Sequence, residues 1–290
     1  MFKISIKEYL KKSIDFLESQ NIKNAGLDAE ILLCYFLKKD KSWLYSNFNY
    51  KLNQNQQKTI DKLIKQRSKN IPVAQITKEK EFYKLKFFVN KNILVPRPET
   101  ELIVEEAIHV IRSTQHATLI DIGTGSGAVI IALAKNIQNS EFFASDISEK
   151  ALYVARKNAR LHKVNKKIKF LKGNLLEPII KNKKLANKAR SYVITANLPY
   201  LTPTQFKEEK SIQAEPKKAL ISGNDGLKDY RKFFKQLKKL TNHSQATIII
   251  EFDPSQTNKL KKIIKQNFPK AKTQTKKDLS GLNRVMVIKI

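Results

Sequence analysis

Three glycines that alternate with small polar residues form the densest cluster of chemically suggestive residues in the chain. Residues 118–134 read TLIDIGTGSGAVIIALA: an apolar stretch contains Asp121 near its end and leads into Gly123, Gly125 and Gly127. An apolar, alanine-spaced run of helical length follows. A strand, a glycine turn and a helix in this order form the first unit of a nucleotide-binding α/β sheet. Glycine is needed there because the chain bends sharply and its backbone lies against the ligand.

The glycine pattern fits two classes of ligand. Gly123, Gly125 and Ala128 match the G-x-G-x-x-G/A pattern of dinucleotide-binding proteins, and Gly127 also makes the segment G-x-G-x-G. Asp121 favours the second pattern, because a carboxylate before the turn suits the cation of S-adenosylmethionine better than a pyrophosphate. The alternative is a tight turn without a ligand. Three of the 8 glycines of the chain fall within five residues here, which argues against that alternative.

Two later positions suit the rest of such a ligand. Phe142–Ser145 predicts a second strand that ends in Asp146, about 20 residues beyond the turn, where an acid hydrogen-bonds ribose hydroxyls. An acid at a helix N-terminus is the alternative, but Ser148 can cap the next helix by itself. A third strand is predicted at 168–171, and Asn174 and Leu175 behind it are placed to flank an adenine ring.

A second polar segment follows the strand predicted at 191–196. Asn197, Leu198, Pro199 and Tyr200 stand at the carboxyl end of a strand that we expect beside the first one. The side-chain carbonyl of Asn197 and the next backbone carbonyl can accept hydrogen bonds from one planar NH2 group. Two such acceptors favour pyramidalisation of an amide or aromatic amine and aim its otherwise delocalised lone pair at an electrophile. A proline-containing turn after a buried strand is the alternative interpretation.

The composition excludes several classes of protein. A formal charge of +30 comes from 56 basic and 26 acidic residues, but only eight of the basic residues are arginines. The charge permits steering toward an acidic partner, whereas the scarcity of arginine forks does not favour specific nucleic-acid binding. The single Cys34 allows no internal disulfide, which fits a reducing cytoplasm. No apolar run reaches bilayer length, and the N-terminus lacks a secretory apolar core.

Metal binding is not predicted, because the histidines stand singly rather than in a ligand cluster. They are His109, His116, His162 and His243.

The first third of the chain predicts a small helical domain and a hairpin. Ser5 and Glu8 form a capping box before one helix, and 28–38 and 53–69 have helical apolar spacing. Pro72 ends this region, so we expect an N-terminal substrate-docking domain at 1–72. The alternating pattern of 76–89 predicts a hairpin within a linker at 73–95.

Residues 96–290 are predicted to form the catalytic domain. Arg97 lies between two prolines and Glu99 follows, in a stiff segment that is either a wall of the active site or a rigid start to the next helix. The pattern further predicts four helices and three strands: helices at 101–111, 151–161, 227–240 and 255–268, and strands at 246–252, 270–276 and 285–290. A terminal antiparallel pair on a parallel sheet is typical of class I methyltransferases rather than of dinucleotide dehydrogenases.

Five segments together resemble the HemK/PrmC protein-(glutamine) methyltransferases: PRPETE at 96–101, DIGTGSG at 121–127, NLPY at 197–200, EP..AL..GNDGL at 215–227 and DLSGLNRV at 278–285. With the helical domain and the hairpin, the resemblance covers nearly the whole chain. It implies a class I S-adenosylmethionine-dependent fold with a Rossmann-like seven-stranded sheet and a terminal antiparallel hairpin, beside a small all-helical N-terminal domain. It also implies a cytoplasmic enzyme that methylates the side-chain amide of the glutamine in the GGQ loop of peptide chain release factors.

The resemblance assigns roles to residues that match the family's motifs. Catalysis and binding of the glutamine fall to Asn197, Leu198, Pro199 and Tyr200, with Arg97 and Glu99 added for substrate binding. S-adenosylmethionine binding falls to Asp121, Gly123, Thr124, Gly125, Ser126, Gly127, Asp146, Asn174, Leu175 and Asn197.

The chain departs from the family at three places. Leu198 replaces the first proline of NPPY, Asn174-Leu175 stands where Asp-Trp is frequent, and Glu251-Phe252-Asp253 replaces E-x-G. NLPY also occurs in rRNA adenine dimethyltransferases. An adenine-amine methyltransferase on RNA or DNA is therefore the second hypothesis, and an inactive basic binding protein with the same fold is the third.

Overall fold

A computed structural model of the chain describes residues 3–112, 117–182, 191–241 and 245–290. Its contacts divide the chain into two compact units. The first runs through Glu79 and includes Glu209–Ala214, and the second comprises Lys80–Glu208 and Glu215–Ile290. Each unit has its own apolar core. The three domain ranges expected from the sequence stay a prediction. No helix in these described ranges is long and apolar enough to cross a membrane.

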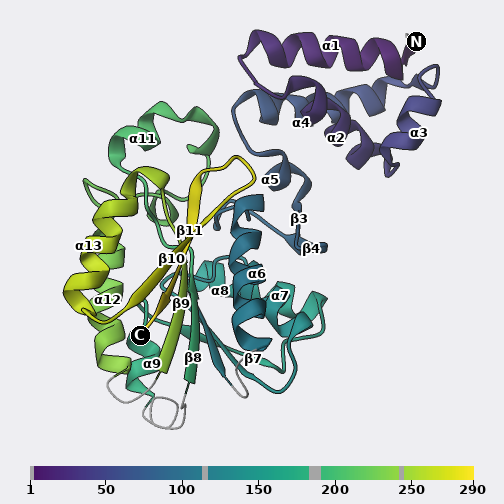
Figure 1. The fold of residues 1–290 in the computed structure, drawn as a ribbon. Coiled ribbons are helices and arrows are strands. Elements are labelled where there is room, and N and C mark those ends of the chain that lie inside the picture. The colour runs from purple at the N-terminus through teal and green to yellow at the C-terminus, as the bar shows by residue number, and fades with distance from the viewer. Residues whose placement is uncertain (1–2, 113–116, 183–190, 242–244) are drawn as a thin grey trace. The chain divides into compact units, whose positions relative to one another are not determined.

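The N-terminal unit is built from short helices around one apolar core (Figure 1). The capping box is confirmed: the Ser5 hydroxyl accepts the backbone N–H of Glu8, and the Glu8 carboxylate accepts that of Ser5. Tyr45 is half exposed and does not fill the core. The unit also contains one minimal strand pair. Its elements are β1 (Ile4–Ser5), α1 (Ile6–Ser19), α2 (Ala25–Leu37), α3 (Lys41–Ser46), β2 (Lys51–Leu52), α4 (Gln54–Ser68) and α5 (Val73–Thr77).

The predicted hairpin is present but begins later than expected. Strands β3 (Glu79–Phe82) and β4 (Leu85–Phe88) pair with each other. Ile76 and Thr77, predicted as strand, instead end helix α5. Pro72 provides a suitable first turn for this helix and Lys78 ends it in the left-handed conformation. Apolar alternation cannot reveal a helix of five residues, which explains the error.

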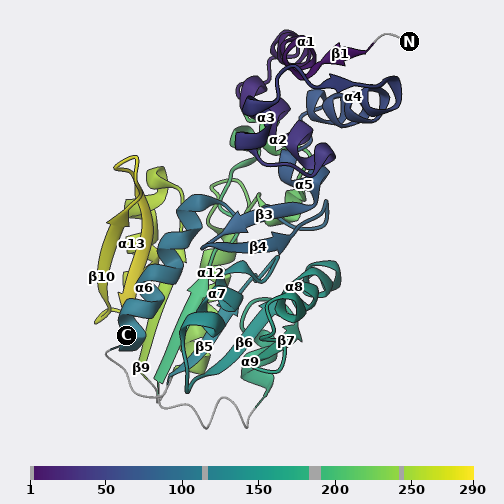
Figure 2. The same cartoon turned by 90° about the vertical axis from the view of Figure 1, so that its right-hand side faces the viewer.

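The second unit contains the predicted seven-stranded sheet. The strand order is β10-β11-β9-β8-β5-β6-β7, and the strands from β9 to β7 are parallel. Strand β11 is antiparallel to both of its neighbours. Figure 2 shows the twist of this sheet. The strands are β5 (Thr118–Ile122), β6 (Glu141–Asp146), β7 (Ile168–Lys172), β8 (Ser191–Ala196), β9 (Gln245–Glu251), β10 (Lys272–Lys277) and β11 (Asn283–Lys289).

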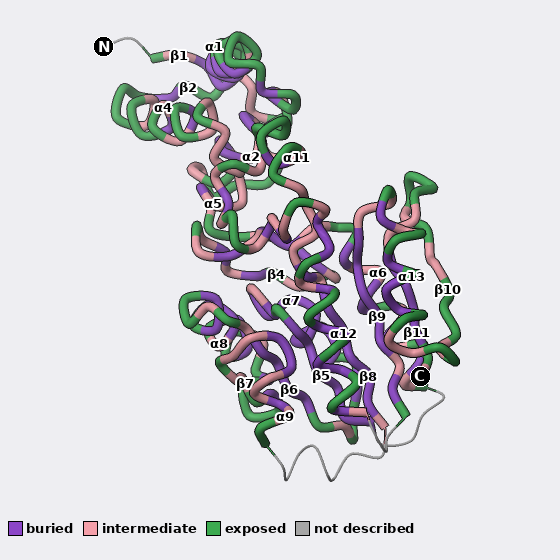
Figure 3. Tube along the Cα trace, turned by 90° about the vertical axis from the view of Figure 1, so that its left-hand side faces the viewer, coloured by how far each residue is buried: buried purple, intermediate pink, exposed green. Residues whose placement is uncertain are grey.

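Helices cover both faces of the sheet, which buries the central strands (Figure 3). All five residues of β5 are buried, as expected for a parallel strand between two helical layers. One layer contains α6 (Glu101–Arg112), α7 (Ala128–Asn136) and α8 (Glu149–Leu161), and the other contains α9 (Glu177–Lys181), α12 (Lys228–Leu240) and α13 (Thr257–Asn267). Shorter pieces are η1 (Pro98–Thr100), α11 (Pro203–Glu208), η2 (Lys210–Ile212), η3 (Lys217–Ala219) and η4 (Pro254–Gln256).

The topology brings the predicted functional segments to one edge of the sheet. The glycine turn follows β5, Asp146 ends β6 and Asn197 follows β8, and these three parallel strands are neighbours. Strand β10 runs in the same direction as β9, so the β10–β11 turn lies at this edge too. In open α/β sheets, ligands bind at the carboxyl ends of the strands.

Candidate active site

The glycine turn folds as a compact loop whose backbone N–H groups close against the next strand. The N–H groups of Gly123 and Thr124 both donate to the Ser145 carbonyl, at 2.9 and 3.0 Å. Gly123, Gly125 and Gly127 have φ angles of 70°, 54° and 81°, a region that strongly favours glycine. A β-carbon on Gly127 would stand 2.9 Å from Ile131 Cδ1. Gly127 is therefore also required for packing, because a side chain there would collide with helix α7.

Asp146 is bound to the turn rather than free in front of it. Its Oδ2 accepts the Gly125 N–H at 2.9 Å, and its Oδ1 accepts the Ser148 N–H at 2.8 Å. Burial raises the pKa of this carboxyl, and the N–H groups of Ser148 and Gly125 oppose that rise. Each oxygen keeps a further lone pair, so these bonds orient the carboxylate and leave it able to accept ribose hydroxyls. Ser148 caps α8 as predicted.

Asp121 is a fully buried acid with no ion pair in the described residues. Its Oδ1 accepts the Thr195 hydroxyl at 2.7 Å. Burial raises the pKa of Asp121 to about 6, the Thr195 hydroxyl opposes the rise, and the charge of Asp146 adds to it. Two neighbouring acids without a basic partner favour a cationic ligand. The two carboxylates beside this turn thus fit S-adenosylmethionine, which is a cation.

The segment expected to flank an adenine has an uncommon backbone. Leu175 has a φ of 57°, which is rare for a branched side chain. Its carbonyl accepts the Ser145 hydroxyl at 2.8 Å, and the next N–H donates to the Gln236 amide oxygen at 2.8 Å. These bonds hold Asn174 and Leu175 beside the end of β6. Their contact with an adenine stays a prediction.

The loop after β8 meets the glycine turn. A β-carbon on Gly123 would lie 3.3 Å from Leu198 Cδ2, and the Leu198 side chain is buried in the core of the second unit. The glycine turn and the loop 197–200 therefore lie next to each other, as predicted. Thr124 and Ser126 of the turn are buried as well.

The Asn197 amide is oriented by two residues from distant parts of the chain. Its Nδ2 donates to Glu251 Oε2 at 3.0 Å and to Thr100 Oγ1 at 3.1 Å. Thr100 in turn donates to Glu251 Oε2 at 2.6 Å. A rotated amide would place its oxygen against the carboxylate, so the NH2 side must face Glu251. This leaves Oδ1, which makes no hydrogen bond within the described residues, as a free acceptor.

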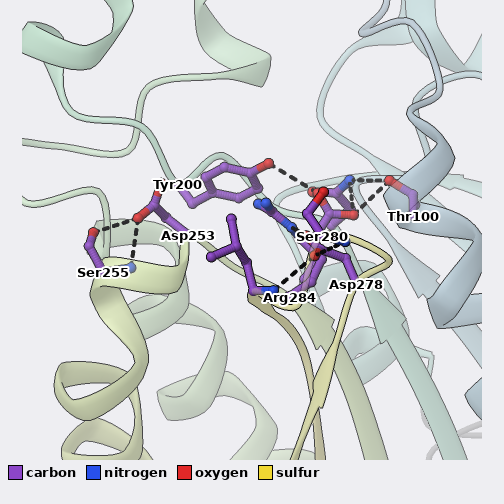
Figure 4. A network of polar contacts seen from close by, with 10 residues as sticks. Thr100, Tyr200, Asp253, Ser255, Asp278, Ser280 and Arg284 are labelled. Carbon is purple, nitrogen blue, oxygen red and sulfur yellow. Dashed lines mark hydrogen bonds and ion pairs between the residues drawn. The ribbon is translucent and has the colours of Figure 1, made fainter.

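Glu251 is the centre of this network, because it accepts side-chain hydrogen bonds from Asn197 and from the Thr100 and Tyr200 labelled in Figure 4. Its Oε1 accepts the Tyr200 hydroxyl at 3.0 Å, and its backbone carbonyl accepts the Tyr230 hydroxyl. Burial raises the pKa of Glu251, and the hydrogen bonds from Thr100 and Tyr200 and the charge of Arg284 oppose the rise. Burial and the Glu251 charge raise the pKa of Tyr200, so its hydroxyl remains a proton donor.

No role for Thr100 or Glu251 is predicted from the sequence. An acid at the end of the apolar strand β9 was the available signal for Glu251. The threonine inside PRPETE was the signal for Thr100.

Arg97 and Glu99 lie differently with respect to the site. Arg97 forms an ion pair with the buried Glu215, which also accepts the Val95 N–H at 2.8 Å. The two family segments that contain these residues are thus tied together, and Arg97 fixes the PRPETE segment. Glu99 is exposed, and its side chain makes no hydrogen bond or ion pair within the described residues. Substrate binding by either residue stays a prediction.

Gly226 and Gln256 pack against the loop 197–200, called here the acceptor loop. The Gln256 side chain donates to the backbone carbonyls of Tyr200 at 2.7 Å and Asp225 at 3.2 Å. Gly226 has a φ of 72°, and a β-carbon there would overlap the Tyr200 carbonyl and the Gln256 amide. The GNDG segment is therefore packed directly against the NLPY loop.

The described residues contain no group of three or more histidine, cysteine, aspartate or glutamate side chains able to hold a metal ion. His116 and His243 lie outside the described residues.

Comparison with known proteins gives the same class of protein. Residues 113–285 match a family described as methyltransferase domain, and residues 8–77 match the PrmC N-terminal domain. Among solved structures, the chain resembles the human METTL16 catalytic domain in complex with a 3′UTR hairpin, with a TM-score of 0.58 and 14% identity, covering 88% of this chain and 90% of that one. The fold is thus that of the class I methyltransferases.

Curated relatives define the family more narrowly. The release factor glutamine methyltransferase of Dictyoglomus turgidum is 35% identical over 270 residues, which is 92% of each chain. That of Buchnera aphidicola is 35% identical over 287 residues, 98% of each chain. The chain belongs to the release factor glutamine methyltransferase family.

Proposed function

We propose that this protein transfers a methyl group from S-adenosylmethionine to the side-chain amide nitrogen of the glutamine in the GGQ loop of peptide chain release factors. Membership of the family supports the reaction and the substrate. The observation that carries the proposal is the Asn197 amide, whose NH2 group is bound to Glu251 and Thr100 while its oxygen stays free. A free, oriented carbonyl is what an incoming amide NH2 requires.

The acceptor residues act by orientation. The Asn197 side-chain carbonyl and the Leu198 backbone carbonyl accept the two hydrogens of the glutamine NH2 group, which favours a pyramidal nitrogen. Pro199 stiffens the loop and Tyr200, fixed by Glu251 and Gln256, forms a wall beside the amide. S-adenosylmethionine, when bound, supplies an electrophilic methyl group on a positive sulfonium. No general base is needed before attack, because the nitrogen loses its proton after it becomes cationic.

The cofactor is assigned to the glycine turn and the ends of the neighbouring strands. Asp146 accepts the ribose hydroxyls and Asp121 faces the cationic part of the ligand. Asn174 and Leu175 flank the adenine, and Asn197 borders the methyl group. The turn residues Gly123, Thr124, Gly125, Ser126 and Gly127 line the backbone cradle.

The remaining assignments concern the protein substrate. The segment 1–72 docks the release factor, and 73–95 links it to the catalytic domain at 96–290. Glu99 contacts the substrate beside the loop 197–200, and Arg97 holds the segment 96–101 in place. The location is the cytoplasm, where release factors act. Specific nucleic-acid binding is not part of the proposal, because the METTL16 likeness at 14% identity concerns the fold alone.

The test is mass spectrometry of a purified release factor after incubation with the protein and S-adenosylmethionine. We expect a gain of one methyl group on the glutamine of the GGQ peptide, and none when that glutamine is replaced by glutamate. Methylation of RNA adenine with an unmodified release factor would refute the proposal and support the adenine-amine alternative.

A further inference from the structure

Two leucines stand in solvent at the tip of the β10–β11 turn, residues 278–282. Leu279 is fully exposed and is the most exposed large apolar side chain in the described part of the chain. Leu282 is half exposed. Exposed single leucines are ordinary, but two on one short turn form an apolar tip.

The turn is rigid although its tip is exposed. Asp278 Oδ1 accepts the backbone N–H groups of Ser280 and Leu282, each at 3.0 Å. The Asp278 backbone N–H donates to the Leu282 carbonyl at 2.9 Å, and the Gly281 N–H returns to the Asp278 carbonyl at 2.9 Å. The N–H groups of Leu282 and Ser280, together with Arg284, hold the pKa of the Asp278 carboxyl below its usual range. The backbone that carries the two leucines is therefore held in place, so little backbone entropy remains to be lost on binding.

The turn is connected by hydrogen bonds to the strand end that contains Glu251, the residue that orients Asn197. Arg284 Nε donates to Asp278 Oδ2 at 3.1 Å, and the Arg284 carbonyl accepts the N–H of Phe252, next to Glu251. Burial raises the pKa of both Glu251 and Tyr200, and the Arg284 charge opposes that rise in each. Figure 4 shows Asp278, Ser280 and Arg284 in one cluster with Tyr200 and Thr100. The turn that carries the apolar tip is thus connected by hydrogen bonds, through Arg284, to the residue next to Glu251.

We propose that Leu279 and Leu282 dock the protein substrate by packing against an apolar patch on the release factor beside its acceptor glutamine. This inference rests on the proposed function. The two glycines of a GGQ sequence offer no side chains, so recognition needs contacts beyond the glutamine. A substrate whose glutamine reaches Asn197 must cover the carboxyl edge of the sheet, where the tip projects. Leucine pairs bury well against an apolar surface and poorly against a charged one such as RNA.

The experiment compares the full-length double variant Leu279→Ser/Leu282→Ser with the parent protein. Steady-state methylation of an intact release factor gives KM and kcat, and calorimetry gives S-adenosylmethionine affinity. We expect KM for the release factor to rise on the order of tenfold, from the lost apolar burial, with kcat at saturation and cofactor affinity unchanged. Leu279→Met/Leu282→Met preserves apolar area and should retain the parental KM.

A matched control is Leu161→Ser. Leu161 is also more than half exposed but ends helix α8, which returns to the opposite edge of the sheet, so its KM should be parental. An unchanged KM in the serine double variant overturns the inference, as does an equal loss in Leu161→Ser. A shift in sedimentation caused by the leucine replacements would instead make the turn a contact between copies of the chain. Absence of release-factor methylation by the parent would refute the proposed function itself.

Discussion

The Glu251 carboxylate accepts hydrogen bonds from Thr100, Asn197 and Tyr200 while it is almost fully buried. A buried carboxylate normally costs stability unless its bonds are complete. Here the bonds also orient the Asn197 amide, because they hold its NH2 group and leave its oxygen to face the proposed glutamine site. The hydroxyl of Thr100 accepts from Asn197 and donates to Glu251, so it couples the two.

Replacement of Thr100 by valine keeps the shape and removes the hydroxyl. We expect a fall in the rate of methyl transfer on the order of tenfold, because the Asn197 amide loses one of its two fixed acceptors and its oxygen is less well oriented in the transition state. Thr100→Ser keeps the hydroxyl and should remain near the parental rate. The measurement is single-turnover methylation of a release factor, with S-adenosylmethionine affinity determined in parallel. Equal rates for the valine and serine variants would mean that Thr100 does not orient the amide.

Asp121 should make the stability of the ligand-free protein depend on pH. Its folded-state pKa is about 6 against an ordinary value of 3.8, so ionisation is disfavoured by folding. Stability contributed by the neutral form is complete below about pH 4 and is lost as the pH rises through about 6. Since one pKa unit corresponds to about 1.4 kcal/mol, the penalty at neutral pH is on the order of 2–3 kcal/mol.

Asp121→Asn removes this titration and keeps an acceptor for Thr195. Chemical denaturation without ligand should show the variant more stable than the parent at neutral pH, with the difference shrinking as the medium is acidified. Calorimetry should show weaker S-adenosylmethionine binding by the variant, because it lacks the carboxylate that we propose faces the cation. A difference in stability that does not change with pH would contradict the assignment of the raised pKa.

The gathering of the candidate residues at one edge of the sheet could be predicted from sequence, but their orientation could not. Asn197 was identified from its place after a strand, and Asp146 from its distance to the glycine turn. The partners that orient Asn197 lie 54 and 97 positions away, so no local pattern connects them. The partner of Arg97 is equally distant: the structure pairs it with Glu215, 118 positions away.

Among elements, strands flanked by turns were predicted more accurately than short helices. Strand β8 has the predicted bounds, because its apolar run is closed by a polar loop. Helix α5 was missed because five residues contain little more than one helical period. Leu198 departs from the family proline, yet its side chain fills the core above Gly123. Packing thus replaces part of the rigidity that a second proline would give the loop.

The GNDG segment supports the acceptor loop through Gly226, and a pair of glycine variants can measure this support. Gly226→Ala adds a methyl group in a left-handed conformation where it overlaps Tyr200 and Gln256, so we expect a loss of about 3 kcal/mol or more. Gly281 has a similar φ of 77° with nothing within 4 Å of an added β-carbon. Gly281→Ala should cost only about 1 kcal/mol. Thermal and chemical unfolding of both variants test this, and equal losses would show that crowding at Gly226 is unimportant.

For the whole molecule, the net charge of +30 is not concentrated in a set of free arginine side chains. Among the residues that the structure describes, five of the chain's eight arginines form ion pairs: Arg67 with Asp28, Arg97 with Glu215, Arg156 with Glu149, Arg231 with Asp225 and Arg284 with Asp278. Lysine supplies the excess charge, which acts mainly on long-range association and solubility. Specificity for a protein partner must therefore come from shaped surfaces.

The N-terminal unit has a complete core of its own, formed by side chains that include Tyr9, Leu17 and Leu32. The second unit has a separate core and contains every residue assigned to the cofactor and the glutamine. Removal of residues 1–79 should therefore leave the second unit folded and able to bind S-adenosylmethionine with parental affinity.

The same truncation should lower kcat/KM for an intact release factor by at least tenfold, because the substrate loses one of its two docking regions. Calorimetry and steady-state methylation measure the two effects on the same preparation, and circular dichroism verifies that the truncated protein is folded. The double leucine variant in the full chain provides the comparison. If the docking surfaces act independently, combining truncation with the leucine replacements multiplies their losses in kcat/KM. Parental kcat/KM in the truncated protein would show that the N-terminal unit does not contribute to substrate binding.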